Sequence, residues 1–230
     1  MTSDSKRRGR PKIHDDGAIL DSALRVFATH GYEGMSMRSL NSELGLSHGT
    51  INQRFGTKEQ LYLDAIDHGF GALLREMVAI ISAEPLPADP LEELRIRFRA
   101  FLLASAKRPH LNRVINNEGV NPSPVLDRIF ERYIAPAMRA TRQLMQRLAD
   151  DGVIEPQSDR AILFILANGA GSAYSLPALA KKFDRVDGKV DGTRYADEMA
   201  TLLVNGLRRH AAATPPRRQP AKRASRSARA

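Results

Sequence analysis

The chain has 230 residues, of which 42% are hydrophobic and 27% charged, an ordinary balance for a globular protein with one or two cores. It contains no cysteine, which excludes disulfide bonds, thiolate metal sites and cysteine nucleophiles. Its net charge of +9 is concentrated at the ends, because five Lys and Arg lie between Lys6 and Lys12 and residues 208–230 carry eight with no Asp or Glu. Basic arms of this kind are typical of proteins that contact phosphates.

Neither a secretion signal nor a membrane span is expected. The N-terminus is charged and polar, without the apolar stretch of a signal peptide. The longest apolar run, residues 161–176, is interrupted by Asn168, Gly169 and Gly171 and falls short of the ~18 uninterrupted apolar residues of a membrane-spanning helix. We therefore expect a cytoplasmic protein with no membrane partner.

The first predicted elements are an arm and a helix. Residues 1–14 show no apolar periodicity and predict a disordered basic arm that contains Arg8 and Arg10. The next apolar residues recur at helical spacing, at Ile19, Leu20, Ala23, Leu24 and Phe27. They predict a helix that starts near the pair Asp15-Asp16 and stops at Gly31, since glycine adopts a left-handed conformation readily.

Two short helices and a long one follow. A helix over 37–44 is expected to end at Gly45, and Ser47 is expected to cap a third helix. The sequence TKEQ that begins at Thr57 matches a capping box and predicts a fourth helix over 57–83. The apolar residues that would form a small shared core are Phe27, Leu40, Leu44, Leu46, Ile51 and Phe55.

The rest of the chain also reads as helical. Further helices are predicted over about 91–106, 109–118, 124–151, 159–180 and 193–209. No segment shows the alternation of a strand, so the predicted fold class is all-α with about nine helices. From Pro215 onward the composition is Pro, Arg, Ala and Ser, which predicts a disordered basic tail over 211–230.

The second and third helices have the layout of a helix-turn-helix, with a glycine at the tight turn and apolar residues at the crossing. The third helix would then present a polar face made of His48, Gly49, Thr50, Asn52, Gln53 and Arg54. Asn and Gln bond adenine, Arg bonds guanine, and Thr offers its methyl group to thymine, so this face suits the major groove of double-stranded DNA.

Residues 18–61 resemble the TetR family of bacterial regulators. The resemblance rests on the order of a helix, a glycine-aromatic turn, a Ser-x-Arg helix, a Gly-Thr recognition helix and the closing residues Phe55, Lys58, Glu59 and Leu61. It implies DNA contacts from Ser36, Arg38, Ser47, His48, Thr50, Gln53 and Lys58. The family usually has an aromatic residue at position 52, so Asn52 is a departure that could read a base instead of touching the phosphate backbone.

The resemblance also implies two domains: a helix-turn-helix DNA-binding domain over 15–56 and a C-terminal helical sensor and dimerisation domain over 57–210, linked by the helix 57–83. The last two helices would pair with those of a second subunit, which places two recognition helices about 34–36 Å apart on a palindromic operator. The expected function is a homodimeric repressor released by a small-molecule effector. The candidate effector contacts are Phe98, Phe101, Asn117, Met138, Asn168 and Tyr174, although aromatic and Met residues at helical spacing are more often simple core.

Several alternatives remain open. Arg8 and Arg10 could enter a narrow minor groove or bind phosphates without sequence preference, and the tail could hold DNA or only keep the protein in solution. An architectural nucleoid protein would bind every duplex equally, whereas an enzyme would need a catalytic constellation that the sequence does not show. The small-residue run that starts at Gly169 lies within a predicted helix, so a dinucleotide-binding loop is disfavoured. No cofactor or metal is expected.

Overall fold

The computed structural model describes residues 15–83, 85 and 87–209. The predicted arm with Arg8 and Arg10, and the predicted tail 211–230, lie outside the described residues. The helices in chain order are α1 (Asp16–Gly34), α2 (Met37–Glu43), α3 (Thr50–Phe55), α4 (Lys58–Ile81), α5 (Pro90–Lys107), α6 (His110–Glu118), α7 (Pro124–Ile129), α8 (Ala135–Asp150), α9 (Asp159–Phe164), α10 (Ser172–Ser175), α11 (Pro177–Ala180), α12 (Asp184–Asp187) and α13 (Gly192–Leu207).

The described residues form no strand and only one isolated β-bridge, between Ile154 and Arg208, so the predicted all-α class is confirmed. Among these residues, no helix combines the length and the apolar character needed to cross a bilayer.

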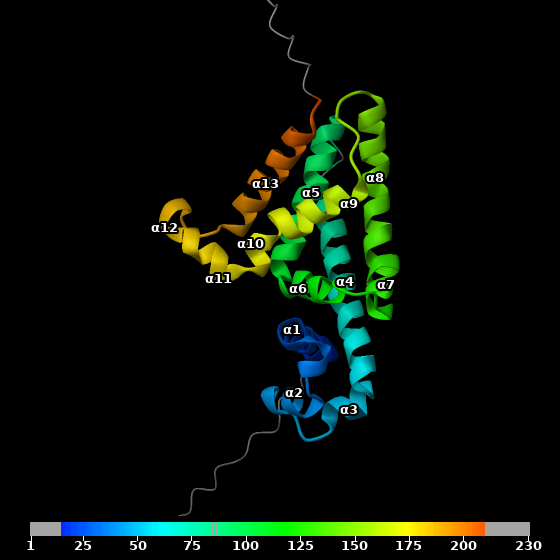
Figure 1. The fold of residues 1–230 in the computed structure, drawn as a ribbon, viewed down its shortest axis with the longest axis vertical. Helices are drawn as coiled ribbons and strands as arrows, with labels where there is room; N and C mark the ends of the chain where they lie inside the picture. The colour runs from blue at the N-terminus through cyan, green and yellow to red at the C-terminus, as the bar shows by residue number, and fades with distance from the viewer. Residues whose placement is uncertain (1–14, 84, 86, 210–230) are drawn as a thin grey trace, which may run out of the picture.

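Helices α1, α2 and α3 form a small unit at one end of the molecule (Figure 1). Helix α1 begins at Asp15, whose carboxylate accepts a hydrogen bond from the Ala18 N–H at 2.6 Å, and its regular part stops at Gly31, where φ is +71°. The glycine turn after α2 also forms, with φ of +63° at Gly45. The predicted shared core is present: Phe27, Leu40, Ile51 and Phe55 are buried, with Leu44 and Leu46 packed against them.

Helix α4 runs from this unit into the larger helical body (Figure 1). Its predicted cap forms, because the Thr57 hydroxyl accepts a hydrogen bond from the Gln60 N–H at 3.1 Å. The capping box is only half formed, since the Gln60 amide donates to Asp64 at 2.7 Å instead of turning back to Thr57. One hydrophobic cluster extends from α1 through α4 to Leu111 and Tyr133, so the two predicted domains share a continuous core.

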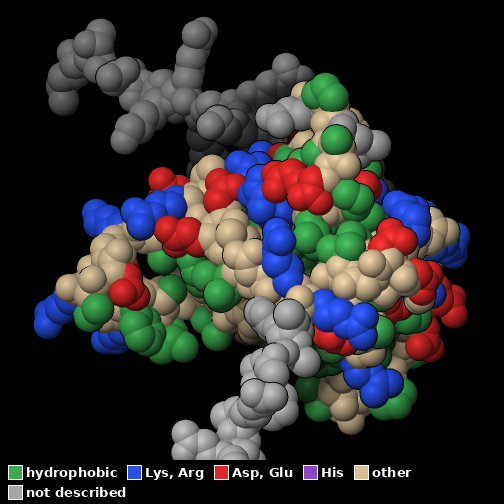
Figure 2. All heavy atoms as spheres, turned by 90° about the horizontal axis from the view of Figure 1, so that it is seen from above, with side chains coloured by type: hydrophobic (Ala, Val, Ile, Leu, Met, Phe, Trp, Pro, Cys, Tyr) green, Lys and Arg blue, Asp and Glu red, His purple; other side chains and the backbone are tan. Residues whose placement is uncertain are grey.

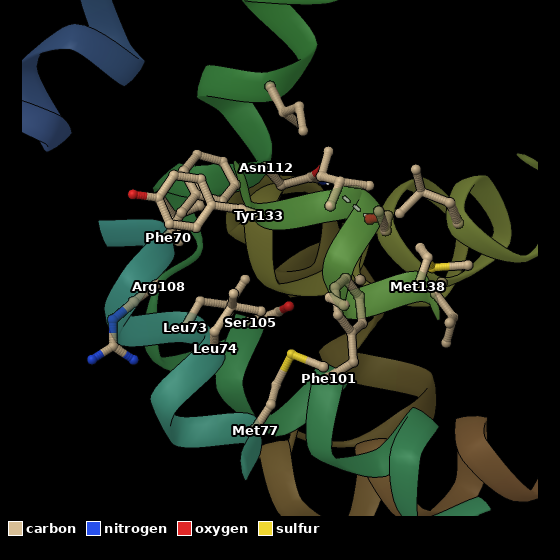
Figure 3. Close-up of a pocket in the computed structure, with 18 of the residues that line it drawn as sticks. Phe70, Leu73, Leu74, Met77, Phe101, Ser105, Arg108, Asn112, Tyr133 and Met138 are labelled. Atoms are coloured by element: carbon tan, nitrogen blue, oxygen red, sulfur yellow. Dashed lines mark hydrogen bonds between the residues drawn. The ribbon is translucent and has the colours of Figure 1, made fainter. Parts of the chain in front are cut away.

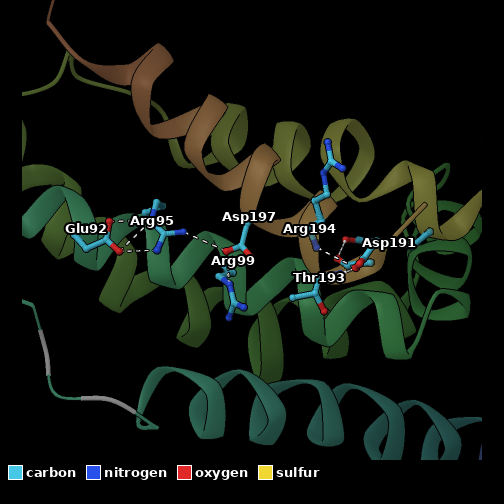
Figure 4. Close-up of polar contacts among 9 residues, drawn as sticks. Glu92, Arg95, Arg99, Asp191, Thr193, Arg194 and Asp197 are labelled. Carbon is cyan, nitrogen blue, oxygen red and sulfur yellow. Dashed lines mark hydrogen bonds and ion pairs between the residues drawn. The ribbon is translucent and has the colours of Figure 1, made fainter. Parts of the chain in front are cut away.

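A second hydrophobic cluster holds the body together. It contains buried residues from α5, α8, α9 and α13, namely Leu91, Leu94, Phe98, Leu144, Met145, Leu148, Ile162, Ala200 and Val204, together with Ile154 and Leu166. Polar contacts reinforce it, because Asp197 of α13 accepts hydrogen bonds from Arg95 at 3.4 Å and Arg99 at 2.5 Å, both on α5 (Figure 4). One face of α13 is therefore fixed on α5.

Two of the later predicted helices differ in detail. The helix predicted over 124–151 forms as α7 and α8, joined by a π-helical turn over Phe130–Ile134. The helix predicted over 159–180 forms as α9, a π-helical turn over Ile165–Ala170 and α10. It ends at Ser175, because Leu176 leaves the helical region (φ −118°, ψ 56°). The cause is Pro177, whose ring disfavours the helical conformation of the residue before it.

Candidate functional site

Helix α3 starts later than predicted. Gly49 adopts φ of +88° and α3 begins at Thr50. The Ser47 hydroxyl lies 2.7 Å from the Thr50 hydroxyl and makes no cap bond to the backbone of α3, so the predicted capping role of Ser47 is wrong. Ser47 contacts the start of the helix through its backbone instead, because its carbonyl accepts a hydrogen bond from the Thr50 N–H at 3.1 Å. Gly49 between them takes the left-handed conformation without strain.

The position of α3 depends on Asn41, a residue that the sequence reasoning missed. Asn41 of α2 is only 4% exposed. Its side-chain amide donates to the Met37 carbonyl at 2.9 Å, and its side-chain oxygen accepts from the Ile51 N–H at 3.2 Å. The Asn41 carbonyl also accepts from the Leu46 N–H at 2.9 Å. Asn41 thus ties α2, the turn and α3 together.

The side of α3 that faces away from the core carries polar side chains. Asn52 and Gln53 are exposed, while Ile51 and Phe55 are buried against α1 and α4. Arg54, which the sequence predicts to lie on this face, forms an ion pair with Asp16 of α1. That pair adds a connection between α3 and α1, and Asn52 and Gln53 are the exposed polar side chains at the centre of the face.

The residues that flank α3 are also accessible. Ser36 caps α2 by accepting from the Ser39 N–H at 3.3 Å, and Arg38, Ser47 and His48 are exposed. The Lys58 ammonium lies 4.4 Å from the centroid of the Tyr32 ring and 3.4 Å from the Glu33 carbonyl oxygen. Lys58 is therefore a positive charge held at the start of α4, close to where a phosphate would meet a helix N-terminus.

A second candidate site is a cavity of about 110 Å³ in the helical body. Figure 3 shows Phe70, Leu73, Leu74 and Met77 of α4, with Phe101 and Met138 across from them. Of the predicted effector contacts, Phe98, Phe101, Met138 and Tyr174 line this cavity. Asn117 and Asn168 do not, and both are exposed on the surface.

Asn112 of α6 is one of the polar residues that line the cavity. Its amide donates to the Ala167 carbonyl and to the Ser175 hydroxyl, both at 3.1 Å. These two bonds fix the orientation of the amide, and its oxygen is buried without a hydrogen-bond partner among the described residues. The charged Arg97 in the wall is already paired with Glu93, at 2.6 Å.

Helix α4 connects the two sites. Its first turn carries Lys58, and its later turns supply cavity residues from Phe70 to Met77. Between them, Gly69 lets Leu24 of α1 and Leu111 of α6 approach closely, since a Cβ at this position would lie 2.9 Å from Leu111 Cδ2 and nearer still to Leu24. The same part of α4 carries Asp67, which is bonded to α7 and to the turn that follows it.

Asp67 accepts hydrogen bonds from Arg128 at 3.1 Å, from Arg132 at 2.9 Å and from the Tyr133 hydroxyl at 2.7 Å. Partial burial opposes its ionisation, but the hydrogen bonds and positive charges outweigh burial and leave the pKa of Asp67 below its ordinary value. The carboxylate therefore anchors α4 to α7 and to the turn that follows it, where Tyr133 and Ile134 line the cavity.

The sequence held a signal for Asn41. It lies four residues after Met37 and three before Leu44, which places it on the apolar side of α2, where a buried polar group needs partners. Asn112 follows Leu111 on a short helix with buried Leu111 and Val114, and no comparable pattern separates it from its neighbours Asn116 and Asn117.

Comparisons with known proteins agree with this arrangement. Residues 19–65 match the family described as "Bacterial regulatory proteins, tetR family", and residues 87–168 match the C-terminal domain of the HTH-type transcriptional dual regulator CecR. An uncharacterized HTH-type transcriptional regulator of Bacillus subtilis, YezE, is 29% identical over 190 residues, which cover 80% of this chain and 96% of the relative. The HTH-type transcriptional repressor ComR of Escherichia coli is 40% identical over 62 residues, 27% of this chain and 30% of ComR.

Solved structures show the same fold. The ketosteroid transcriptional regulator KstR2 of Mycobacterium tuberculosis superimposes with a TM-score of 0.64 at 16% identity, covering 88% of this chain and 100% of KstR2. A tetR-family regulator from Rhodococcus RHA1 gives 0.59 at 20% identity, covering 84% and 97%. The relatives are named as transcriptional regulators and not as enzymes. With its helix-turn-helix end, its helical body and these matches, the chain belongs to the TetR family of DNA-binding transcriptional regulators.

Proposed function

We propose that the protein is a homodimeric repressor that binds a palindromic operator through α3 and is released when an apolar molecule enters the cavity. The observation that carries the proposal is the path of α4, which begins beside the reading face of α3 and supplies one wall of the cavity. The repressor ComR, similar over part of the chain, supports the direction of control.

On DNA, Gln53 and Asn52 would contact base edges, and Thr50 would lie beside them. Ser36, Arg38, Ser47, His48 and Lys58 would contact the phosphate backbone on either side. Two copies related by a twofold axis would place their recognition helices about 34–36 Å apart. Large apolar side chains are exposed at the end of α9 (Phe164), in the turn after it (Ile165) and on α13 (Leu202), and they support a second copy on that side.

Selection of bound fragments from random double-stranded DNA tests the reading face. The expected result is a palindromic site preferred at least ~10³-fold over other sequences. Gln53→Ala should lose about 1–3 kcal/mol of discrimination at one or two base pairs, whereas Lys58→Ala should weaken binding to all sequences alike. Equal affinity for every duplex would instead identify an architectural protein, and unchanged operator binding by Gln53→Ala would show that another face reads the bases.

The cavity predicts the chemistry of the effector. Its walls are mainly apolar, and the oxygen of Asn112 accepts hydrogen bonds but has no partner among the described residues. We expect an uncharged, mainly apolar molecule with one hydroxyl or similar donor group. Two other buried polar atoms have no partner among the described residues. Nε2 of His110 belongs to a residue that does not line the cavity, and the guanidinium group of Arg108 points away from the labelled apolar side chains in Figure 3.

Matched ligand series test this expectation. Alcohols and phenols should raise the melting temperature and release operator DNA more strongly than the hydrocarbons of the same shape, while carboxylic acids that outperform the alcohols would assign the head group to Arg108 instead. Ala137→Phe, which fills the cavity, should bind DNA but no longer respond. Ala140→Phe places the same side chain on the exposed face of α8 and is the matched control.

A release mechanism follows from the position of α4. A molecule wedged against Phe70, Leu73 and Met77 would favour a position of α4 in which the two recognition helices no longer match adjacent major grooves. The ligand shifts the equilibrium only by the difference between its affinities for the two states. The factor by which saturating ligand lowers operator affinity should therefore equal the factor by which saturating operator lowers ligand affinity.

A further inference from the structure

The segment 177–190 has few contacts of its own. It is called the arm from here on and is distinct from the basic arm predicted over 1–14. It comprises α11, a 3₁₀ turn over Lys181–Phe183, α12 and the residues up to Val190, and none of its helical residues is buried. Isolated helices of this length are marginal in water, because too few hydrogen bonds offset the ordering of the chain. The arm therefore needs a surface to pack against in order to keep its shape.

The base of the arm is fixed. The Tyr174 hydroxyl donates to the Gly192 carbonyl at 3.0 Å, and the Tyr195 hydroxyl donates to the Ala170 carbonyl at 3.1 Å. The two rings meet edge to face with centroids 5.5 Å apart. These contacts close the chain on itself just before and just after the arm, so the arm projects from a defined place on the body (Figure 1).

One side of the arm is apolar. Leu179, Phe183 and Val186 are separated by four and three residues, which places them on one helical face, and they are 58%, 56% and 84% exposed. Leu176 and Val190, which lie just before and just after these helical turns, are also exposed. Figure 2 shows hydrophobic side chains gathered along one edge of the projection at the left.

The apolar area exposed between Phe164 and Leu202 is as large as a typical protein interface. Eight large apolar residues between Phe164 and Leu202 are exposed: Phe164, Ile165, Leu176, Leu179, Phe183, Val186, Val190 and Leu202. At roughly 80–100 Å² each they total on the order of 700 Å², close to the ~800 Å² that each subunit buries in a standard protein interface. Monomeric proteins rarely expose contiguous apolar patches above about 300–600 Å².

The arm adjoins, along the chain, the apolar residues at which the dimer is proposed to form. It connects α10 to α13, so its stripe follows Phe164 and Ile165 in the chain and precedes Leu202. It carries charges of both signs, with four cations (Lys181, Lys182, Arg185 and Lys189) and two anions (Asp184 and Asp187), and Asp191 follows directly after it. An apolar stripe between charges of both signs fits a protein surface better than DNA phosphates.

We propose that the arm of each subunit packs its Leu179–Phe183–Val186 stripe on a second copy of this chain. The inference rests on the homodimer proposed above and extends its interface beyond the last long helices. In a twofold dimer this contact occurs twice, so any change in the arm acts on both ends of the interface.

Sedimentation equilibrium of the full chain tests the proposal. Leu179→Glu combined with Phe183→Glu should raise the dimer dissociation constant by about tenfold or more, because it places two charges in an apolar contact. The matched control, Lys182→Ala with Arg185→Ala on the same arm, should change it less than threefold. Circular dichroism and the melting temperature at low protein concentration check that both variants fold.

Cysteine labelling gives a second measurement, since the chain has no cysteine of its own. The thiol of Val186→Cys should react with maleimide more slowly as protein concentration rises through the dimerisation range, whereas that of Lys182→Cys should not. The arm contact would be overturned, and the dimer left standing, if Leu179→Glu with Phe183→Glu kept the wild-type dissociation constant and the Val186→Cys thiol reacted equally fast at every protein concentration. A wild-type chain that stays monomeric at all concentrations would overturn both.

Discussion

Replacing Asn41 with alanine tests whether a single buried amide sets the position of the recognition helix. The substitution leaves the N–H of Ile51 without an acceptor, and Ile51 is 0% exposed. A buried donor left unpaired costs about 1–3 kcal/mol. For a chain of this size each kcal/mol corresponds to roughly 2–4 °C in melting temperature, so Asn41→Ala should melt several degrees below the wild type.

The same change should affect DNA binding in a particular way. Because α3 is no longer fixed to α2 through the Ile51 N–H, operator affinity should fall while non-specific affinity at low salt changes little. The control is Asn52→Ala, which removes the same side chain from the exposed face of α3. It should alter operator choice but not the melting temperature. An Asn41→Ala variant that melts and binds the operator like the wild type would refute the reasoning.

Two further predictions concern α4. Gly69→Ala should lower the melting temperature through overpacking of about 1–3 kcal/mol, because its Cβ would lie 2.9 Å from Leu111 Cδ2 and nearer still to Leu24. Adding Leu24→Val should recover part of the loss, and no recovery would place the strain elsewhere. Asp67→Asn should lower the melting temperature at neutral pH by weakening the bonds to Arg128 and Arg132. Since the pKa of Asp67 lies below its ordinary value of 3.8, this stabilisation is present above about pH 4 and is lost as the pH falls further. The difference between wild type and variant should therefore shrink in denaturation experiments at pH 3, and a constant difference would contradict the assigned role.

The DNA-binding end was largely predictable from the sequence. Helical periodicity placed α1, α2 and α4, and the positive φ values at Gly31 and Gly45 agree with the predicted turns. Local signals suffice there because each helix start or stop is set by a few adjacent residues. The exception was Ser47, where two competing local signals, a serine cap and the Gly49 turn, were present and the glycine set the start of the helix.

The body of the protein depended on contacts between residues far apart in the chain. Periodicity identifies a buried face but not the face that it meets. Of the predicted effector contacts, Phe98 and Met138 therefore line the cavity, while Asn117 and Asn168 lie outside it. Asn112 lines the cavity because α10 supplies its partner Ser175, which is 63 residues away.

The sequence alone determined the all-α class, the helix-turn-helix and the polar face of its third helix, because these follow from the order of neighbouring residues. Only the tertiary structure decided which polar groups are buried, where the cavity lies, and that Arg54 pairs with Asp16. The physical reason is that hydrogen bonds and burial depend on which surfaces meet, and packing between distant helices selects those surfaces.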